Sequence, residues 1–248
     1  MIIQLVSFAN NRFKSKERQF RIDSISRILN ETAADFIMFS PYILNKKDDL
    51  ETIAKNVRNK KVTALFELKE TKQKNNRFYL IKEGSITNLN TDQIFVNSKE
   101  VSVGNVNRLI EELELHRKFE VAGRKFLLIE CGENNILKGN SKTAEFRITN
   151  RQDLKKHFFQ ILNDADIILN PVHSKWSRYG CFLSRMRKFS ENKRYCFSCT
   201  CIQDERQLER ARKSPVKNVT QQAMHSKRLI SPINPIRSEE FLLQTYEI

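Results

Sequence analysis

Two hydrophobic patterns alternate along most of the chain. Continuous apolar runs of strand length are separated by segments whose apolar residues recur at helical spacing. The pattern predicts strands over 2–8, 35–39, 61–66, 77–81, 124–131, 166–170, 195–202 and 241–248, and helices over 20–29, 50–57, 105–117, 153–162 and 182–189. No Pro/Gly/Ser-rich linker interrupts this alternation, which therefore predicts one α/β domain spanning residues 1–248.

Composition supports a folded, basic protein. Of 248 residues, 40% are hydrophobic and only 6 are Gly, which excludes disordered and collagen-like chains. No window approaches the roughly 18 consecutive apolar residues of a membrane span, and the first residues lack the features of a secretory signal. We therefore expect a cytoplasmic protein without a membrane partner, whose five Cys are reduced thiols.

The formal net charge of +15 is unevenly distributed. Residues 175–228 contain 14 Lys or Arg and four acids, a net charge of +10. Such a region is either a solvated surface or a face for nucleic acid or an acidic partner protein. No motif for reading bases is present, so sequence-specific recognition of nucleic acid is not predicted.

Cys131 ends the strongest apolar run and is followed at once by Gly132, Glu133 and two Asn. Open α/β sheets bind their ligands beyond the carboxyl ends of strands, so a nucleophile on a tight turn fits this position. By spacing and periodicity alone a small buried core residue is the favoured interpretation, because most cysteines outside disulfides have that role.

Four segments resemble motifs of a known family and follow one another in the order of that family. They are Ala34–Phe39, Leu128–Asn134, Ala165–Pro171 and Arg185–Asn192. In this order they resemble the strand before the catalytic glutamate, the nucleophile elbow, the "ADxIxNP" strand and the "RARAxEN" helix of the nitrilase superfamily of carbon–nitrogen hydrolases. Residues 239–248 are similar to the last strand of that family. The resemblance covers nearly the whole chain and implies a single-domain, four-layer α-β-β-α sandwich.

The resemblance also implies a chemistry. A cysteine attacks an amide or nitrile carbon, a glutamate transfers protons, and a lysine stabilises the oxyanion. Carried over, Cys131 is the nucleophile and the Gly132 backbone N–H an oxyanion donor. Glu133, in the same segment, and His173, just past Asn170-Pro171, are candidates for the border of the pocket. His173 has the alternative of being an exposed loop histidine. The resemblance further implies a homodimer, and we expect neither a cofactor nor a metal.

The other two members of the triad depart from the family pattern. Where the family has Phe-Pro-Glu, this chain has Phe39-Ser40-Pro41-Tyr42, with no acid before Asp48. Glu67 lies at the end of the next predicted strand. It either points into the pocket that contains Cys131 or is a surface acid beside Lys69. Lys99 is the lysine candidate by spacing, whereas alignment from Gly84 places residues 92–95 there and leaves no lysine.

Two metal-dependent interpretations are possible. Cys196, Cys199 and Cys201 lie on one predicted strand, where alternation separates 196 from the other two, so we interpret them as core residues and not as ligands. Residues 64–69 form a strand ending in Glu67-x-Lys69, which resembles half of a PD-(D/E)xK nuclease site. There Glu67 would hold Mg²⁺ and Lys69 would activate water. The partner aspartate should close an upstream strand, but Asp35 opens one.

The sequence thus predicts hydrolysis of a small-molecule amide through a Cys131 thioester. The alternative is a catalytically degenerate module of the same fold that contacts nucleic acid or a partner through residues 175–228. By analogy, such a module fits an antiviral system linked to a reverse transcriptase. The Mg²⁺-dependent nuclease is the third interpretation.

Overall fold

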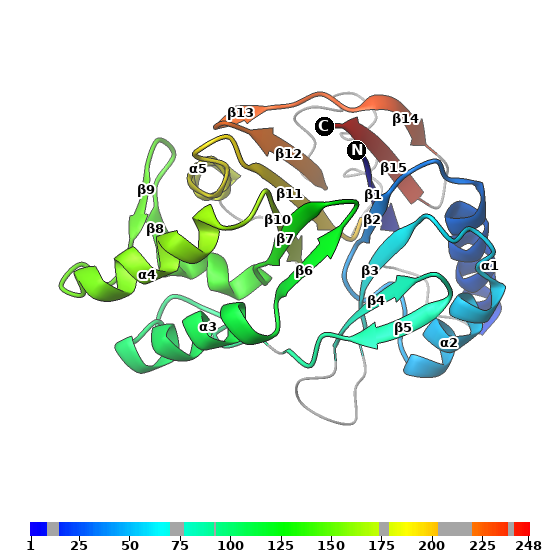
Figure 1. Cartoon of the computed structure of the whole chain (residues 1–248), viewed down its shortest axis with the longest axis horizontal. Coiled ribbons are helices and arrows are strands. Elements are labelled where there is room, and N and C mark those ends of the chain that lie inside the picture. The colour runs from blue at the N-terminus through cyan, green and yellow to red at the C-terminus, as the bar shows by residue number, and fades with distance from the viewer. Residues whose placement is uncertain (9–14, 70–76, 92, 174–178, 203–219, 238–240) are drawn as a thin grey trace.

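The computed structural model describes residues 1–8, 15–69, 77–91, 93–173, 179–202, 220–237 and 241–248. Within these ranges two large β-sheets are stacked against each other, and helices cover their outer faces (Figure 1). The four-layer α-β-β-α sandwich predicted from the sequence is therefore confirmed.

The first sheet is seven-stranded and mixed. Its order is β14 (Ile233–Arg237), β15 (Phe241–Glu247), β1 (Ile2–Phe8), β2 (Phe36–Phe39), β3 (Thr63–Glu67), β4 (Phe78–Lys82) and β5 (Ser85–Asn88). Strands β1, β2 and β3 are parallel, so their carboxyl ends share one edge. Helices α1 (Ser15–Glu31) and α2 (Lys47–Asn56) cover the outer face.

The second sheet is six-stranded. Its order is β13 (Arg228–Leu229), β12 (Gln221–His225), β11 (Tyr195–Thr200), β10 (Ile167–Val172), β7 (Arg124–Leu128) and β6 (Lys118–Val121). The central strands β7, β10 and β11 are parallel. Helices α3 (Val103–Leu115), α4 (Gln152–Asn163) and α5 (Tyr179–Phe189) lie outside them, beside a small hairpin of β8 (Leu137–Gly139) and β9 (Ala144–Phe146).

Three apolar layers hold these elements together. One lies between the sheets, and the other two lie between each sheet and its helices. In the inter-sheet layer the rings of Phe36 and Phe126, one from each sheet, have centroids 4.7 Å apart. Strands buried on both faces explain why the sequence shows continuous apolar runs instead of alternation.

The helices form where an apolar stripe and a start signal coincide. In α3 the buried stripe is Val106, Leu109, Ile110 and Leu113, and the Ser102 side chain accepts a hydrogen bond from the Asn105 N–H at the amino end. Packing of this stripe on the second sheet supplies most of the stability of a helix of this length.

The structure corrects the sequence prediction at several elements. The strand predicted over 124–131 ends at Leu128, because Cys131 begins the 3₁₀ helix η1 (Cys131–Ile136). Strands β5, β6, β8, β9, β12, β13 and β14 are not predicted by the hydrophobic pattern, since they are short, or polar, or lie at sheet edges. Cys196, Cys199 and Cys201 are core residues as predicted, with exposed fractions of 3% or less.

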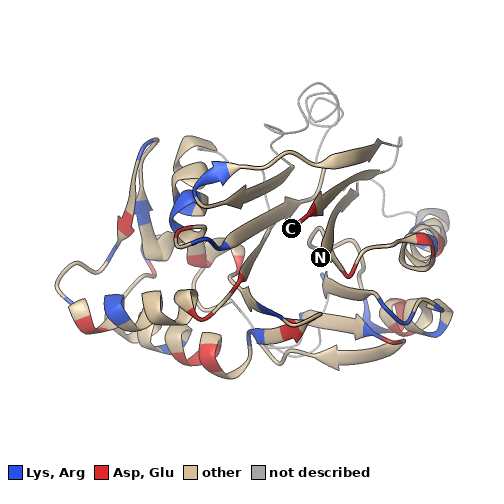
Figure 2. Cartoon of the chain, turned by 45° about the horizontal axis from the view of Figure 1, so that its top comes forward, with Lys and Arg blue, Asp and Glu red and all other residues tan. Residues whose placement is uncertain are grey.

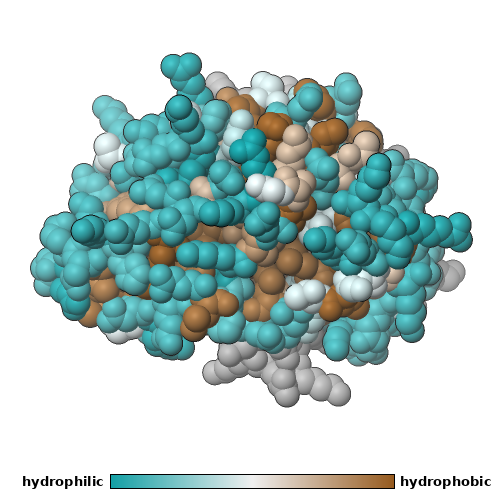
Figure 3. All heavy atoms as spheres, in the orientation of Figure 1, coloured by the Kyte–Doolittle hydropathy of each residue, from teal (hydrophilic) through white to brown (hydrophobic). Residues whose placement is uncertain are grey.

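The surface is polar over most of the face seen in Figure 1, with apolar side chains gathered near its centre (Figure 3). Lys and Arg are interspersed with Asp and Glu along the helices (Figure 2). In the described part of the chain, no helix combines the length and the apolar character needed to cross a bilayer.

Candidate active site

The carboxyl ends of two parallel strands place Cys131 and His173 at one edge of the second sheet. Leu128 of β7 is paired with Leu169 of β10, and the Ile129 N–H donates to the Leu169 carbonyl at 2.9 Å. Cys131 follows β7 and His173 follows β10, and both are partly exposed. The thiol therefore lies where open α/β sheets bind ligands.

Hydrogen bonds fix the turn that carries the thiol. Glu130 and Glu133 form a capping box, in which the Glu130 N–H donates to Glu133 Oε2 at 3.0 Å. Asn134 Nδ2 donates to Asn170 Oδ1 at 2.9 Å, and Asn170 Nδ2 donates to the Ile129 carbonyl at 2.7 Å. Strand β10 thus holds the turn from both sides of Cys131.

Gly132 lets a second segment approach the turn. A Cβ at this position would lie 1.9 Å from Gln93 Nε2, 2.3 Å from the Phe95 carbonyl oxygen and 2.6 Å from Val96 Cα. The segment after Gln93 therefore packs directly on the residue that follows Cys131. The side chain at this contact is Gln93 and not a lysine.

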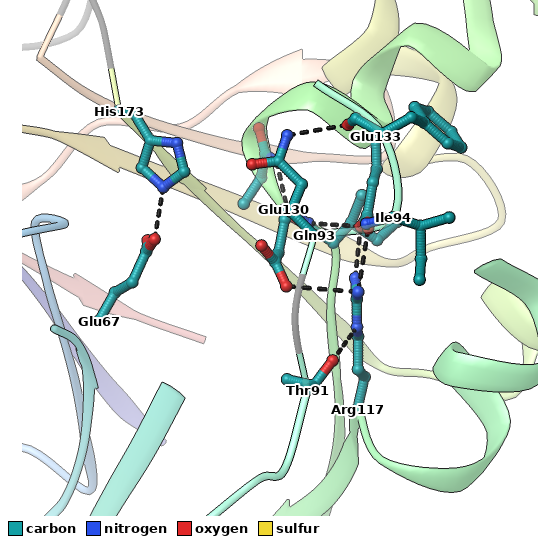
Figure 4. Close-up of polar contacts among 11 residues, drawn as sticks. Glu67, Thr91, Gln93, Ile94, Arg117, Glu130, Glu133 and His173 are labelled. Carbon is teal, nitrogen blue, oxygen red and sulfur yellow. Dashed lines mark hydrogen bonds and ion pairs between the residues drawn. The ribbon is translucent and has the colours of Figure 1, made fainter. Parts of the chain in front are cut away.

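A buried arginine lies behind the turn. The Arg117 guanidinium is fully buried, with Nη2 at 2.9 Å from Glu133 Oε1 and 3.3 Å from Glu130 Oε1, and a second bond joins Nη1 to Glu133 Oε2 (Figure 4). Its Nε donates to Thr91 Oγ1 at 2.6 Å. Burial opposes the charge, but Glu133 and Glu130 outweigh it and the pKa of Arg117 is raised. Breaking such a buried cluster costs about 3–5 kcal/mol.

The first sheet contributes a carboxylate to the same site. Glu67, at the end of β3, is 2% exposed and its Oε1 lies 2.5 Å from His173 Nε2 (Figure 4). Glu67 Oε2 is buried and makes no hydrogen bond to the described residues. The carboxyl edges of the two sheets therefore meet at this pair.

Tyr42 covers the pair. Its ring stacks on His173 with centroids 4.6 Å apart and planes 9° apart, and its hydroxyl accepts from Arg77 Nη1 at 3.3 Å. Burial, followed by Glu67, raises the pKa of Tyr42, and Glu130 and Cys131 act in the same direction. Tyr42 therefore remains a neutral phenol among the site's acidic groups, at the position after Pro41 where the resemblance expects a glutamate.

The structure separates the predicted site residues into two groups. Cys131, Gly132 and His173 lie together at the sheet edge. Glu133 is fully buried and bound to Arg117, so it fixes the turn instead of lining an open pocket. The Lys99 side chain is exposed, and the Lys99 backbone N–H donates to Asn97 Oδ1. Lys99 thus extends toward solvent, where an oxyanion ligand is not expected.

Glu67 is the site residue whose role the sequence left most uncertain. Its interpretation as a surface acid is wrong, because Glu67 is buried while Lys69 is exposed. The signal was present in the sequence, since an acid that closes a continuous apolar run reaches the carboxyl edge of the sheet. The partner, His173, lies 106 residues away and carries no local signal.

Metal-ligand geometry is not found in the described ranges. They contain no group of three or more His, Cys, Asp or Glu placed to hold a metal ion. Asp35, the nuclease candidate's partner, accepts a hydrogen bond from the Ile2 N–H at the start of β2. It lies at the opposite end of its strand from the edge reached by Glu67.

Comparison with known proteins identifies the fold. No family model and no curated protein matches the sequence. Among solved structures, an amidase from Nesterenkonia sp. superposes with a TM-score of 0.55 at 10% identity over 99% of this chain and 90% of its own. A cysteine-to-alanine mutant of the Nesterenkonia AN1 amidase "from the nitrilase superfamily" gives 0.54 at 10% identity, again over 99% and 90%.

A glutamine-dependent NAD⁺ synthetase from Acinetobacter baumannii gives a TM-score of 0.53 at 11% identity. The match covers 99% of this chain and 45% of the synthetase. This chain therefore has the fold of nitrilase-superfamily carbon–nitrogen hydrolases, as its motif order predicts.

Proposed function

We propose that this protein hydrolyses a non-peptide carbon–nitrogen bond of a small amide through a thioester on Cys131. In place of the missing glutamate, the Glu67–His173 pair transfers the protons. The observation that carries the proposal is the 2.5 Å contact between Glu67 Oε1 and His173 Nε2 at the sheet edge that also carries Cys131. A carboxylate that orients an imidazole beside a thiol is a recurrent arrangement for activating a nucleophile.

The geometry suggests the role of each atom. When His173 Nε2–H donates to Glu67, the other ring nitrogen is the acceptor, and Figure 4 places it on the side of Glu130. It takes the thiol proton as sulfur attacks the carbonyl carbon, and the Gly132 N–H donates to the developing oxyanion. The carbon–nitrogen bond then breaks, and the amine leaves with the proton from His173.

Deacylation repeats these roles with water. Water loses a proton to His173 as it attacks the thioester carbon, the carbon–sulfur bond breaks, and the proton returns to sulfur. A glutamate-to-glutamine mutant of the Nesterenkonia amidase shows covalent addition of the acetamide moiety of fluoroacetamide at its active-site cysteine. That observation supports a cysteine as the reacting group on this fold.

The first prediction concerns the acyl-enzyme. Incubation with a library of small amides, followed by mass spectrometry, should give an adduct on Cys131 that is absent from Cys131→Ala. Glu67→Gln and His173→Gln should each slow its formation by about 10²–10⁴-fold, the usual contribution of a general base. Glu120→Gln, which removes an exposed acid from β6, is the matched control and should leave the rate unchanged.

Alkylation of the cysteine thiols tests the reactivity of Cys131 independently of any substrate. Burial raises the pKa of Cys201 to about 11 and also raises the pKa of Cys196 and Cys199, so these thiols should react with iodoacetamide only after unfolding. Cys131 and Cys181 are partly exposed. Faster labelling of Cys131 than of Cys181 supports the hydrolase, and equal, slow labelling without any acyl adduct contradicts it.

A second candidate function is a catalytically degenerate module that binds nucleic acid or an acidic protein through residues 175–228. It is favoured by Tyr42 at the glutamate position and by the exposed Lys99. Failure of every amide to acylate Cys131 would leave this function as the better account of the fold.

A further inference from the structure

Two arginines are gathered beside the turn that carries Cys131. Arg147 Nε donates to the Asn135 carbonyl at 2.7 Å, and Arg185 Nη2, from α5, donates to Asn135 Oδ1 at 3.1 Å. Asn135 belongs to η1, and its own Nδ2 donates to the Gly132 carbonyl at 2.8 Å. One residue of the nucleophile's turn therefore orients both guanidinium groups.

These two cations have no acidic partner within the described residues. In that part of the chain neither forms an ion pair with a carboxylate, and Arg185 Nε is buried without a hydrogen-bond acceptor. This differs from Arg117 on the other side of the turn, which two buried carboxylates neutralise. A buried N–H without an acceptor is costly, and like charges held together repel each other, so an anion would relieve both.

Arg185 lies close enough to Arg147 and to the Cys131 thiol for both to act on its charge. Burial lowers the pKa of Arg185, and the nearby charge of Arg147 lowers it further, while Cys181 and Cys131 act in the opposite direction. Guanidinium N–H groups also match the planar geometry of carboxylate and phosphate oxygens.

We propose that Arg147 and Arg185 form an oxyanion subsite beside Cys131 that binds a carboxylate or phosphate group of the substrate. This assignment rests on the proposed function, because it takes Cys131 to be the group that attacks the substrate. It defines the substrate class as anionic amides, in which the negative group lies within a few bonds of the scissile carbonyl.

Alkylation of Cys131 by two matched reagents tests the subsite without turnover. Iodoacetate carries the carboxylate that iodoacetamide lacks, and the two reagents are otherwise alike. The ratio of their rate constants at Cys131, measured by peptide mapping in a Cys181→Ser background, is compared with the same ratio for N-acetylcysteinamide. A general activation of the thiol raises both rates equally and leaves the ratio unchanged.

We expect the ratio at Cys131 to exceed that of the model thiol by at least about tenfold, the effect of one charge-assisted contact. Arg185→Gln and Arg147→Gln should each return it toward the model value. Arg124→Gln, at the opposite, exposed end of β7, is the matched control and should not change it. Inorganic phosphate and succinate at millimolar concentration are tested separately on the protein that keeps both arginines. Each should slow the alkylation of Cys131 by iodoacetate, and the stronger inhibitor identifies which oxyanion the subsite prefers.

A ratio equal to that of the model thiol, or one that both arginine variants leave unchanged, overturns the subsite. Protection by phosphate requires no variant, so the proposal stays testable if an arginine variant fails to fold. The two proposals can fail separately. A normal reagent ratio together with acylation of Cys131 removes the subsite alone, whereas a raised ratio without any acylation removes the hydrolase alone.

Discussion

Tyr42 is the residue at which this site departs most clearly from the nitrilase motif, which has a glutamate at that position. Its backbone has a φ of 62°, a left-handed conformation that costs a residue with a side chain about 1–2 kcal/mol. The Tyr42 N–H donates to the Glu67 carbonyl at 2.9 Å, and the ring stacks on His173. Two contacts to the Glu67–His173 pair offset the backbone cost, which links this unusual residue to the function proposed for the pair.

The close packing at Gly132 supports a prediction about stability. Gly132→Ala should destabilise the fold by about 2–3 kcal/mol or more, because its Cβ would overlap the Phe95 carbonyl oxygen, 2.3 Å away, and cannot be accommodated by moving a side chain alone. Chemical unfolding measures the change. Alkylation of Cys131 should change as well, since the Gln93 segment must move away from the turn.

Gly104 is the matched control for Gly132. It lies in the first turn of α3, where a Cβ would meet no described atom within 4 Å, so Gly104→Ala should stabilise the protein by up to about 1 kcal/mol. Equal effects of the two substitutions would contradict the close packing described at the turn that carries Cys131.

The sequence predicts the positions of some site residues better than those of others. Cys131 could be predicted, because an apolar run that stops at a thiol and a glycine is a local signal. Glu67 was recognised only as one of two alternatives, because its burial depends on a histidine 106 residues away. Lys99 was selected by spacing, but the segment from Gln93 to Val96 turns outward after it packs on Gly132, which leaves Lys99 exposed.

At the scale of elements, helix α5 and the β12–β13 turn are joined by one carboxylate. Glu191 Oε2 lies 2.6 Å from Lys188 Nζ, and its Oε1 lies 3.1 Å from Lys227 Nζ. Burial raises the pKa of Glu191, but the two lysines outweigh this effect and the pKa is lowered overall. The carboxylate therefore stabilises the folded state in its charged form.

The lowered pKa of Glu191 determines how the stability of the protein should depend on pH. A folded pKa below the unfolded value contributes stability above the unfolded pKa, near 4.3, and loses it as the pH falls through the folded pKa. Glu191→Gln should thus lower stability at pH 7 by about 0.5–1 kcal/mol, a value reduced for partial exposure, and the difference should shrink as the pH falls below the unfolded pKa and vanish below the folded pKa. Thermal unfolding across pH measures it, with Glu120→Gln as the exposed control. A difference that grows toward low pH would contradict the ion pairs.

The predicted elements share a physical property. Every strand predicted from a continuous apolar run is present, since burial on both faces is written into local composition. Strands such as β12 (Gln221–His225) were missed because polar side chains occupy buried positions there. Gln221 Nε2 donates to the carbonyls of Leu5 and Leu242, so its burial depends on strands more than 20 residues away along the chain.

At the scale of the whole molecule, the site exists only because two sheets are stacked. Glu67 belongs to the first sheet, whereas His173 and Cys131 follow strands of the second. The inter-sheet layer that includes Phe36 and Phe126 sets their separation. The order of the motifs predicts the fold that brings these residues together. The pairing of Glu67 with His173 cannot be predicted from the sequence near either residue, because the two lie on different sheets.

The distribution of the +15 net charge predicts how the protein binds nucleic acid. In the described part of residues 175–228, several basic side chains are buried or bound to groups of the same protein. Arg194 is buried with Nε bound to the Phe189 carbonyl, and Lys188 and Lys227 bind Glu191. Lys193 and Arg228 remain exposed, while residues 203–219 lie outside the described ranges.

Binding of a labelled DNA duplex should therefore be weak and fall steeply with salt, as expected for contacts to phosphates alone. Each neutralised phosphate contributes about −0.9 to the slope of log K against log salt. Replacing both Lys193 and Arg228 by Gln should reduce that slope by up to about 2, and Lys142→Gln, an exposed lysine of the β8–β9 turn, is the control. Fluorescence anisotropy from about 50 to 200 mM salt measures the slope. Tight binding that persists at the upper end of this range would show a built nucleic-acid interface and would favour the binding module over the hydrolase.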